Sequence, residues 1–306
     1  MKPNVVWMVV FVAALAALPA WAGEKPQRVE EAYPGLTPGA LAYALIGELP
    51  EGTLLKSQAV RVTAKELQAE LDGAPEFLRE QLKKNAPFIL EQMTAGRLLL
   101  EAAKKSAAEK KSDVSGKPDA EIVQAYLDPA LDKVKVSAKE VKEFYDKNVA
   151  MCGGTPFDKM KTDLEQYLLQ QKKEEAAAAY VKTLGQRLDI TVSATWLKEQ
   201  ATLSRDNPVD RARSAGKPAL VAFGGAGCCG PDPMAATLAA VEEQFKDRMS
   251  LISVEAKKEP VLAARYGVNS IPAQILFDKG GKEVFRHNGV MSEEEITEQL
   301  KAVGVK

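Results

Sequence analysis

The sequence contains few of the residues on which metal, redox and acid–base chemistry usually depend. Its 306 residues include three cysteines, Cys152, Cys228 and Cys229, and one histidine, His287. A single imidazole excludes chemistry that needs two. No C-x-x-C or H-x-x-x-H spacing is present, so we expect no metal site and no cofactor. Three cysteines also provide no disulfide framework, so burial of apolar side chains must hold the chain together.

The sequence also lacks an excess of charge of either sign. The formal net charge is −1, and lysine and glutamate are interspersed along the chain. This pattern argues against nucleic acid as a partner, because a nucleic-acid-binding domain concentrates positive charge on one face.

Long apolar runs are missing after the first 22 residues. Lys2 precedes an apolar stretch from Val5 to about Pro19, and "AWA" follows it directly before Gly23. A basic start, an apolar stretch and small residues at a cleavage site are typical of a secretory signal peptide, here residues 1–22. The alternative is an uncleaved N-terminal anchor, for which the run is short. We therefore expect a periplasmic protein with no stable membrane insertion after cleavage.

The chain is long enough for two domains, and its two halves have different patterns. Residues 23–199 are predicted to be mainly helical, residues 200–207 to be a linker, and residues 208–306 to form an α/β domain. The expected fold class is thus α followed by α/β.

Several local signals define the helical half. Thr63 with Glu66, and Ser137 with Glu140, have the spacing of a capping box at the start of a helix. "GTLLKSQAVRV" is expected to form a short strand pair or an extended arm. A long helix is predicted from about Pro156 to Leu184, and "LDITVSATWL" is predicted to close this half as a strand.

The segments "VTAKEL", "LEQMTAGRLLLEAAKK", "KVKVSAKEVKEFYDKN" and "LEQYLLQQKKEEAAAAYVKTLGQRLDITV" occur in this order. Together they resemble the N-terminal chaperone domain of the SurA/PrsA foldase group. The resemblance implies a helical cradle that holds unfolded polypeptide clients. The parvulin module that often follows "FYDKN" is replaced by "VAMCGGT", and this half has no histidine, so prolyl isomerase activity is not expected.

The second half alternates strands and helices. "ALVAF" is a strand of buried type, "MAATLAAVEEQF" a helix and "SLISVEA" the next strand. "EPVLAARYGVNSIPAQILFD" supplies a helix, a turn and a strand, "KEVFRHNGV" the last strand and "SEEEITEQLKAV" the last helix. Asn207 with Pro208, and Ser292 with Glu295, are helix-start signals.

This order, with "GKPALVAF", "RYGVNSIPAQILFDKGGKEV" and a Cys-Gly-Pro loop, resembles thioredoxin over residues 208–305. The resemblance implies a cis peptide bond between Ile271 and Pro272, in a loop beside the active-site cysteine that pairs with the substrate backbone. Ile271 and Pro272 are therefore the candidate substrate-binding residues.

The loop "GAGCCGPDPM" (225–234) departs from the C-x-x-C pattern of that family. Two registers are open: Cys229 is the nucleophile and Asp232 replaces the second cysteine, or Cys228 is the nucleophile and Pro231 replaces it. Without a second thiol a mixed disulfide must wait for an outside thiol. A carboxylate at Asp232 disfavours a nearby thiolate, and Asp232-Pro233 is predicted to cap a helix that starts after the cysteines.

Three ways to restore redox chemistry stay open. Cys228 and Cys229 can pair with each other in a strained ring, Cys152 can act as a resolving thiol from the other half, or one thiol can hold clients as mixed disulfides. The leading hypothesis is a chaperone whose degenerate thioredoxin domain adds a client- or partner-binding surface. The alternative is a thiol–disulfide oxidoreductase or isomerase that uses Cys228 or Cys229 and has thiol-containing proteins as partners. A third reading is an assembly partner with neither activity.

Overall fold

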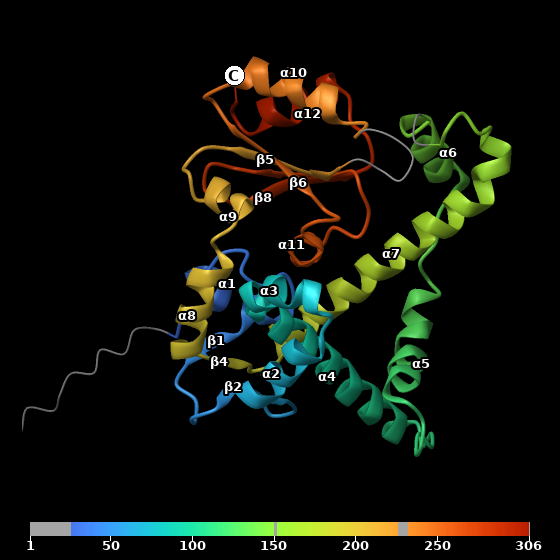
Figure 1. Cartoon of the computed structure of the whole chain (residues 1–306). Coiled ribbons are helices and arrows are strands. Elements are labelled where there is room, and N and C mark those ends of the chain that lie inside the picture. Colours follow the sequence, from blue (N-terminus) through green and yellow to red (C-terminus); the bar gives the residue numbers. More distant parts are fainter. Residues whose placement is uncertain (1–25, 150–151, 226–231, 306) are drawn as a thin grey trace, which may run out of the picture.

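The protein has two parts, each built around its own four-stranded sheet (Figure 1). The computed structural model describes residues 26–149, 152–225 and 232–305. The predicted signal peptide, residues 1–22, lies outside the described residues. Of the helices within those ranges, none combines the length and the apolar character that crossing a membrane requires.

The first part is mainly helical, with four short strands. In chain order its elements are α1 (Val29–Ala32), the 3₁₀ helix η1 (Ala40–Tyr43), β1 (Leu45–Gly47), β2 (Thr53–Lys56), β3 (Arg61–Thr63), α2 (Ala64–Gly73), α3 (Glu76–Lys84), α4 (Ala86–Glu109), α5 (Asp119–Leu131), α6 (Ala138–Lys147), α7 (Phe157–Arg187), β4 (Thr191–Ser193) and α8 (Ala194–Ser204).

The local signals in the sequence place several of these elements correctly. Thr63 and Glu66 form a reciprocal capping box at the start of α2, as do Ser137 and Glu140 at the start of α6. The segment 53–63 forms the predicted strand pair, in which β2 and β3 are antiparallel. Each cap gives a backbone N–H at the helix start an acceptor within the helix's own first turn, so the sequence alone fixes it.

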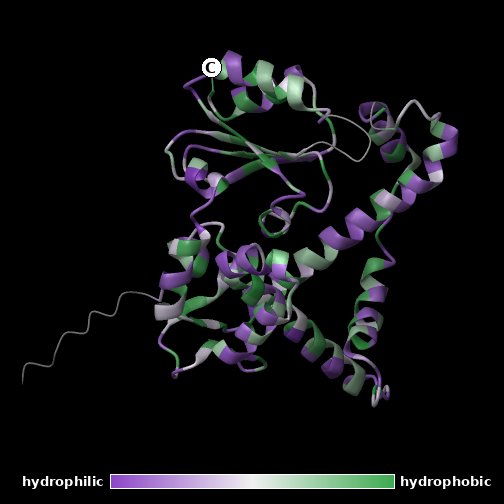
Figure 2. Ribbon diagram, in the orientation of Figure 1, coloured by the Kyte–Doolittle hydropathy of each residue, from purple (hydrophilic) through white to green (hydrophobic). Residues whose placement is uncertain are grey.

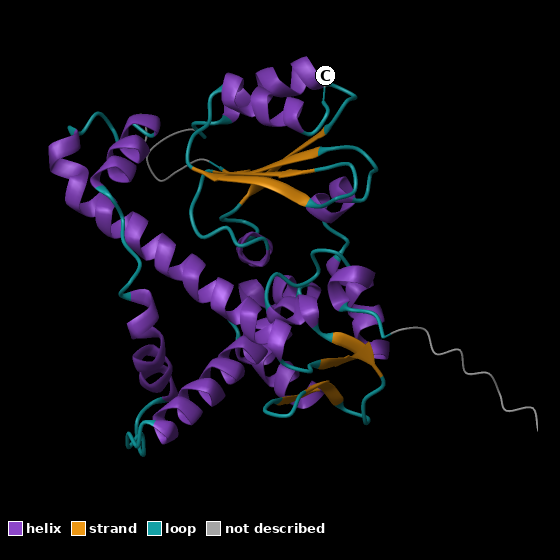
Figure 3. Ribbon diagram, turned by 180° about the vertical axis from the view of Figure 1, so that it is seen from behind, coloured by secondary structure: helices purple, strands orange, loops and turns teal. Residues whose placement is uncertain are grey.

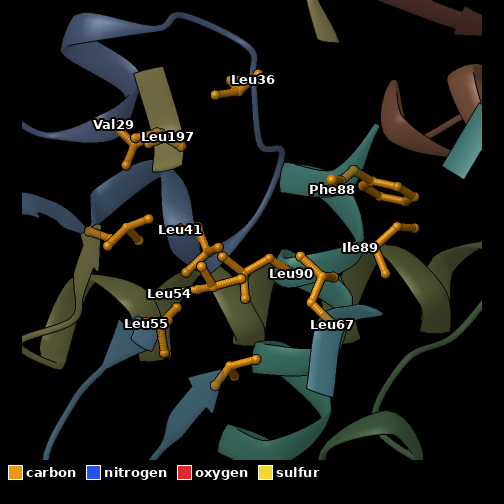
Figure 4. Close-up of a cluster of buried hydrophobic side chains, with 14 of the residues drawn as sticks. Val29, Leu36, Leu41, Leu54, Leu55, Leu67, Phe88, Ile89, Leu90 and Leu197 are labelled. Atoms are coloured by element: carbon orange, nitrogen blue, oxygen red, sulfur yellow. The ribbon is translucent and has the colours of Figure 1, made fainter. Parts of the chain in front are cut away.

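One compact core joins the two ends of the first part. Strand β1 pairs in parallel with β4, although about 145 residues separate them in sequence. Around this sheet the buried side chains of α2, α4 and α8 pack together (Figure 4). The residues labelled there include Leu41, Leu55, Leu67, Leu90 and Leu197.

Three boundaries differ from the sequence prediction. Helix α7 continues to Arg187, past Gly185, because this glycine packs against η1: an added Cβ would lie 2.4 Å from the Cα of Ala40. Only residues 191–193 of the predicted strand 188–197 are extended, since the Ser193 hydroxyl caps α8. The predicted linker 200–207 is helical up to Ser204 for the same reason, so 205–207 alone connect α8 to α9.

Beyond this core, the C-terminal part of α4 with α5, α6 and α7 forms an open helical frame (Figure 3). Helix α7 has 31 residues, of which only Leu164 and Gly185 are buried. Helices α5 and α6 bury one residue each, Ile122 and Val141. Polar and apolar residues alternate along these helices (Figure 2). The frame thus has amphipathic helices whose apolar sides are only partly covered.

The second part is a four-stranded sheet with helices on both faces. Its elements are α9 (Pro208–Arg213), β5 (Ala219–Gly224), α10 (Ala235–Phe245), β6 (Ser250–Glu255), α11 (Pro260–Arg265), β7 (Ala273–Phe277), β8 (Glu283–Asn288) and α12 (Glu293–Ala302). The strand order is β6-β5-β7-β8, with β5 parallel to β6 and antiparallel to β7.

Each face of this sheet has its own apolar cluster. Side chains of α10 and α12 pack on one face with Leu220 and Leu276, and side chains of α9 and α11 pack on the other with Val221 and Ile275. The alternation along β5 and β7 sends successive side chains to opposite faces. The observed order of strands and helices is the order that the sequence predicts, and both predicted caps, at Asn207 and at Ser292, are present.

Candidate functional site

The candidate site lies at the end of β5, where the buried strand passes into the loop that carries the two adjacent cysteines. Cys228, Cys229 and Pro231 lie outside the described residues, so the choice between the two loop registers stays open. The described flanks of the loop are Gly225 and Asp232, and they are close together.

Asp232 ties these two flanks to each other. Its Oδ2 accepts a hydrogen bond from the Gly225 N–H at 2.9 Å, and its Oδ1 accepts one from the Met234 N–H at 2.8 Å. Helix α10 begins at Ala235, so Met234 rather than Asp232 occupies the N-cap position, which corrects the predicted cap. The helix still starts after the cysteines. Asp232 therefore holds a carboxylate at the base of the loop, in a position fixed by two backbone N–H groups.

The predicted cis-proline segment lies beside this loop. The peptide bond between Ile271 and Pro272 is cis, as expected. The next residue, Ala273, pairs with Phe223, two residues before Gly225, so the segment and the loop share one end of the sheet. The Pro272 carbonyl accepts a hydrogen bond from the Gly289 N–H at 2.8 Å. Pro272 and Gly289 are buried and Ile271 is half-buried.

Helices α6 and α7 of the first part also reach this site, which sequence reasoning did not reveal. The Asn148 Oδ1, at the end of α6, accepts a hydrogen bond from the Val290 N–H at 3.0 Å. The Asn148 Nδ2 donates to the Phe144 carbonyl, so the side chain is held in place. Asn148 is only 3% exposed. No local signal in the sequence relates Asn148 to Val290, because 142 residues separate them.

Cys152 lies near the same end of α6. Its N–H donates to the carbonyl of Asn148, the residue that contacts the second part. Burial raises the pKa of the Cys152 thiol, which lowers its thiolate fraction at neutral pH. Cys152 thus lies next to a residue that contacts the second part, but Cys228 and Cys229 lie outside the described residues, so the resolving-thiol hypothesis stays a prediction.

One row of residues that crosses strands β5, β7 and β8 below the loop contains polar side chains but no carboxylate. Ala222, Gln274 and His287 are paired across β5, β7 and β8. Burial lowers the pKa of His287, and the nearby charge of Lys147 lowers it further, so the imidazole is neutral at pH 7. Gln274 is fully buried, and its amide has no hydrogen-bond partner in the described part of the chain. This row provides no negative charge to accept a proton from a thiol.

Metal-ligating side chains do not gather at the site or elsewhere within the described ranges: no three of His, Cys, Asp and Glu lie together in a way that would hold an ion. Because Cys228 and Cys229 lie outside the described residues, the three redox routes considered from the sequence stay predictions.

The fold and the cis-proline loop define a thioredoxin-like domain. Residues 206–304 match the family model described as a thioredoxin-like domain. The chain is 34% identical over 86 residues to "Thioredoxin-like protein slr0233" of Synechocystis, which covers 28% of this chain and 80% of that protein. It is 33% identical over 97 residues to "Thioredoxin 1" of Chlorobaculum tepidum, covering 31% of this chain and 94% of that protein.

A solved thioredoxin, NaTrxh of Nicotiana alata, aligns with a TM-score of 0.28 and 23% identity over 31% of this chain and 80% of its own. The chain belongs to the thioredoxin-like family through its second part. These relatives suggest a role of the thiol–disulfide oxidoreductase type for that domain. Residues 1–205 lie outside the family match.

Replacing Asp232 with asparagine is expected to increase the reactivity of the loop thiols. A carboxylate near a thiol disfavours the thiolate and raises its pKa, and Asp232 follows Cys229 by three residues in the sequence. In a Cys152→Ser background, we expect Asp232→Asn to raise the rate of iodoacetamide alkylation at pH 7 by roughly threefold and to shift its pH profile to lower pH. Glu243→Gln, which removes an exposed charge from α10, is the matched control. Identical profiles for Asp232→Asn and the parent would contradict the prediction.

Proposed function

We propose that this protein is an exported folding factor that binds unfolded polypeptides through its helical frame and presents a second polypeptide-binding surface on its thioredoxin-like part. The observation that carries the proposal is the poor burial of the frame. Helices α5, α6 and α7 carry apolar side chains along their length, yet they bury only four residues in total: Ile122, Val141, Leu164 and Gly185. Amphipathic helices with uncovered apolar sides are suited to holding extended or helical client segments.

Aromatic side chains follow the frame and support this proposal. Tyr126 of α5 packs against Tyr180 of α7, with ring centroids 6.1 Å apart. Near the other end of α7, Phe144 packs against Tyr167 at 5.6 Å. Tyr167 is 37% exposed and Val149 is 41% exposed. These side chains give an unfolded chain apolar contacts on a scaffold that is already ordered, so binding does not have to order the surface.

The resemblance of the first part to the SurA/PrsA chaperone domain also supports the proposal, as does the signal-like segment 1–22, which is expected to direct export to the periplasm. The pairing of β1 with β4 joins the two ends of the first part and leaves α4 to α7 projecting from a stable base. Prolyl isomerase activity is not part of the proposal.

Aggregation suppression tests the function. The protein is mixed with an unfolded outer-membrane β-barrel protein diluted from urea, and light scattering is followed. We expect the wild type to suppress aggregation, and Val149→Ser combined with Tyr167→Ser to suppress it at least threefold less per mole. Leu203→Ser, which removes an apolar side chain that is 54% exposed on α8, is the matched control. Equal loss in the control variant, or no suppression by the wild type, would reject the proposal.

The aggregation assay also distinguishes a chaperone, which binds clients without its thiols, from a thiol–disulfide oxidoreductase. Changing Cys228 and Cys229 together to serine leaves aggregation suppression unchanged if binding does not involve the thiols. A protein that acts only as an assembly partner would suppress nothing and would pull down one stable companion.

Thiol–disulfide exchange is the second candidate function, and the thioredoxin relatives favour it. The thiolate of Cys228 or Cys229 attacks a client disulfide, one client sulfur leaves as a thiolate, and a mixed disulfide forms. A thiol from another protein or from glutathione then attacks this bond and restores the cysteine. Insulin reduction with dithiothreitol tests this route: catalysis by the wild type that disappears in the double serine variant would establish it.

A further inference from the structure

Two different kinds of contact join the parts of this protein. The first is a buried joint around Arg265 of α11. Its guanidinium donates to the Ser204 carbonyl at 2.8 Å and to the Gly35 carbonyl at 3.1 Å, and lies 2.9 Å from the Asp210 carboxylate. Val261 of α11 packs in the apolar core of the first part. This joint excludes water and holds α11 firmly against the first part.

The second contact lies at the other end of the helical frame and is polar. The Lys147 Nζ is 3.2 Å from the Glu295 Oε1, and both side chains are about half exposed. On α7, the Gln171 Nε2 donates to the Ser270 hydroxyl at 2.9 Å, and Glu174 accepts from the Asn269 amide at 3.0 Å.

Together with the Asn148–Val290 hydrogen bond, these contacts form what we call the latch: Lys147, Asn148, Gln171 and Glu174 on one side, and Asn269, Ser270, Val290 and Glu295 on the other. In Figure 1, α6 and the middle of α7, which carries Gln171 and Glu174, lie beside the thioredoxin-like part.

The latch lies next to the candidate polypeptide-binding surface. Asn269 and Ser270 directly precede Ile271 and Pro272, while Val290 follows Gly289, whose N–H is bonded to the Pro272 carbonyl. Pro272 and Gly289 are buried, and an added Cβ on Gly289 would lie 2.7 Å from the Asn148 Oδ1. The Asn148 amide oxygen thus accepts the backbone N–H of Val290 as the carbonyl of an extended peptide would.

We propose that the latch is a displaceable cover, which an unfolded polypeptide replaces at the Val290 N–H and along the Ile271–Pro272 segment. The proposal rests on the proposed function for the identity of the competitor. The physical basis is the contrast between the two contacts. An exposed ion pair or a single hydrogen bond stabilises a contact by about 1 kcal/mol of free energy or less. Breaking a buried pair of charged groups costs much more free energy. The frame therefore releases at the latch while the joint stays closed.

Hydrogen exchange tests the opening itself. The described acceptor of the Val290 N–H is the Asn148 side chain, whereas Ile275 lies inside β7. In the wild-type chain we expect the Val290 amide to exchange at least a hundredfold faster, relative to its intrinsic rate, than the Ile275 amide. Asn148→Ala and Lys147→Glu are each expected to speed exchange of the Val290 amide further. Lys139→Glu is the control, since Lys139 pairs with Glu143 within α6.

The affinity for an unfolded polypeptide tests whether the latch blocks the binding surface. Reduced, carboxymethylated α-lactalbumin, which stays unfolded, is the probe. Because a site that is covered most of the time binds with reduced apparent affinity, we expect Lys147→Glu to bind the probe at least threefold more tightly than the wild type, and Lys139→Glu to bind as the wild type does.

The outcomes are distinguishable. Equal protection of Val290 and Ile275 would show that the latch opens only on unfolding and would overturn the proposal. Faster exchange with weaker probe binding would show that α6 and α7 form part of the binding surface, which also overturns it. Faster exchange in Lys147→Glu with no binding of the probe to any variant would reject the proposed function while supporting the latch as a reversible contact.

Discussion

Arg265→Met is expected to lower the free energy of unfolding by about 3–5 kcal/mol, the typical effect of removing one partner from a buried charge pair. Arg265 is 2% exposed and lies 2.9 Å from Asp210. Methionine fills similar space but donates no hydrogen bond, so the carbonyls of Gly35 and Ser204 lose the guanidinium donor that holds them. Urea unfolding followed by circular dichroism measures the change.

Asp210 explains why the effect is large. This carboxylate is 4% exposed and lies between Arg265 and Arg213, and it accepts a hydrogen bond from the Tyr266 hydroxyl at 2.8 Å. Removing one of the two guanidinium groups leaves a buried carboxylate with less positive charge around it. Arg213 has a second task, because it donates to the Gly281 carbonyl at 2.8 Å and 3.0 Å, and cannot move to compensate.

The same variant is expected to separate the unfolding of the two parts. Arg265 is in the thioredoxin-like part, whereas Gly35, Asn85 and Ser204 belong to the first part. The sequence has three tryptophans, of which Trp7 and Trp21 lie in the predicted signal peptide, so in a chain prepared without residues 1–22 the fluorescence of Trp196 reports the first part alone. In Arg265→Met we expect fluorescence and circular dichroism to give different midpoints. Arg211→Met, which removes an exposed ion pair with Asp206, is the control and is expected to change the stability by about 0.5 kcal/mol or less. A loss below about 1 kcal/mol in Arg265→Met would contradict the account.

Glu91→Gln is expected to remove a pH dependence of stability between about pH 5 and pH 8. Glu91 lies on α4 and is 1% exposed, and burial raises its pKa to about 7. In the unfolded chain the carboxyl has lost its proton above about pH 4.5, so the folded state binds the extra proton in this window. The free energy of unfolding of the wild type therefore falls as the pH rises through the window, by about 3 kcal/mol from this group. Denaturant titrations at several pH values measure it.

Hydrogen bonds to η1 satisfy the buried Glu91 carboxylate and limit the rise of its pKa. The Glu91 Oε1 and Oε2 accept hydrogen bonds at 2.8 Å from the N–H groups of Ala40 and Leu41, at the start of η1. These bonds favour the charged form but are outweighed by desolvation. Gly39 is required at this approach, because an added Cβ would lie 2.4 Å from the Glu91 Oε1.

Glu91→Ala, which leaves both N–H groups without an acceptor, is expected to cost about 3 kcal/mol or more. Glu101→Gln, at an exposed position of α4, is the control and keeps the wild-type pH slope. If Glu91→Gln and the wild type lose stability in parallel from pH 5 to pH 8, the proton is not held at Glu91.

The comparison of sequence and structure shows which features depend on neighbouring residues. The capping boxes at Thr63, Ser137 and Ser292 and the order of strands in the second part were predicted, and the strand pair was one of two alternatives for residues 52–62. Each depends on residues a few positions apart, so the pattern is visible in one stretch of sequence. The ends of α7 and of the segment 200–207 were misplaced, because Gly185 packs on Ala40 and Ser193 starts a further helix.

The candidate site likewise combines residues that the sequence predicted with contacts that it did not reveal. The sequence identified Ile271, Pro272 and the cysteine loop, because these follow from short motifs on a recognisable fold. It did not reveal that Asn148 contacts Val290, that Arg265 joins the two parts, or that Glu91 caps η1. Those contacts join residues 50 or more positions apart, and their side chains are common polar types with no distinctive spacing.

By itself, the sequence determined the thioredoxin-like fold of residues 206–304 and the absence of a spaced pair of cysteines, because strand pattern, turn residues and cysteine spacing are local properties. Only the tertiary structure decided that Asn148 bonds the Val290 N–H, next to the Pro272 segment, and that the Asp232 carboxylate bonds Gly225 at the other flank of the loop. The physical reason is that such contacts depend on where whole helices pack, which is set by the buried core and not by any single stretch of residues.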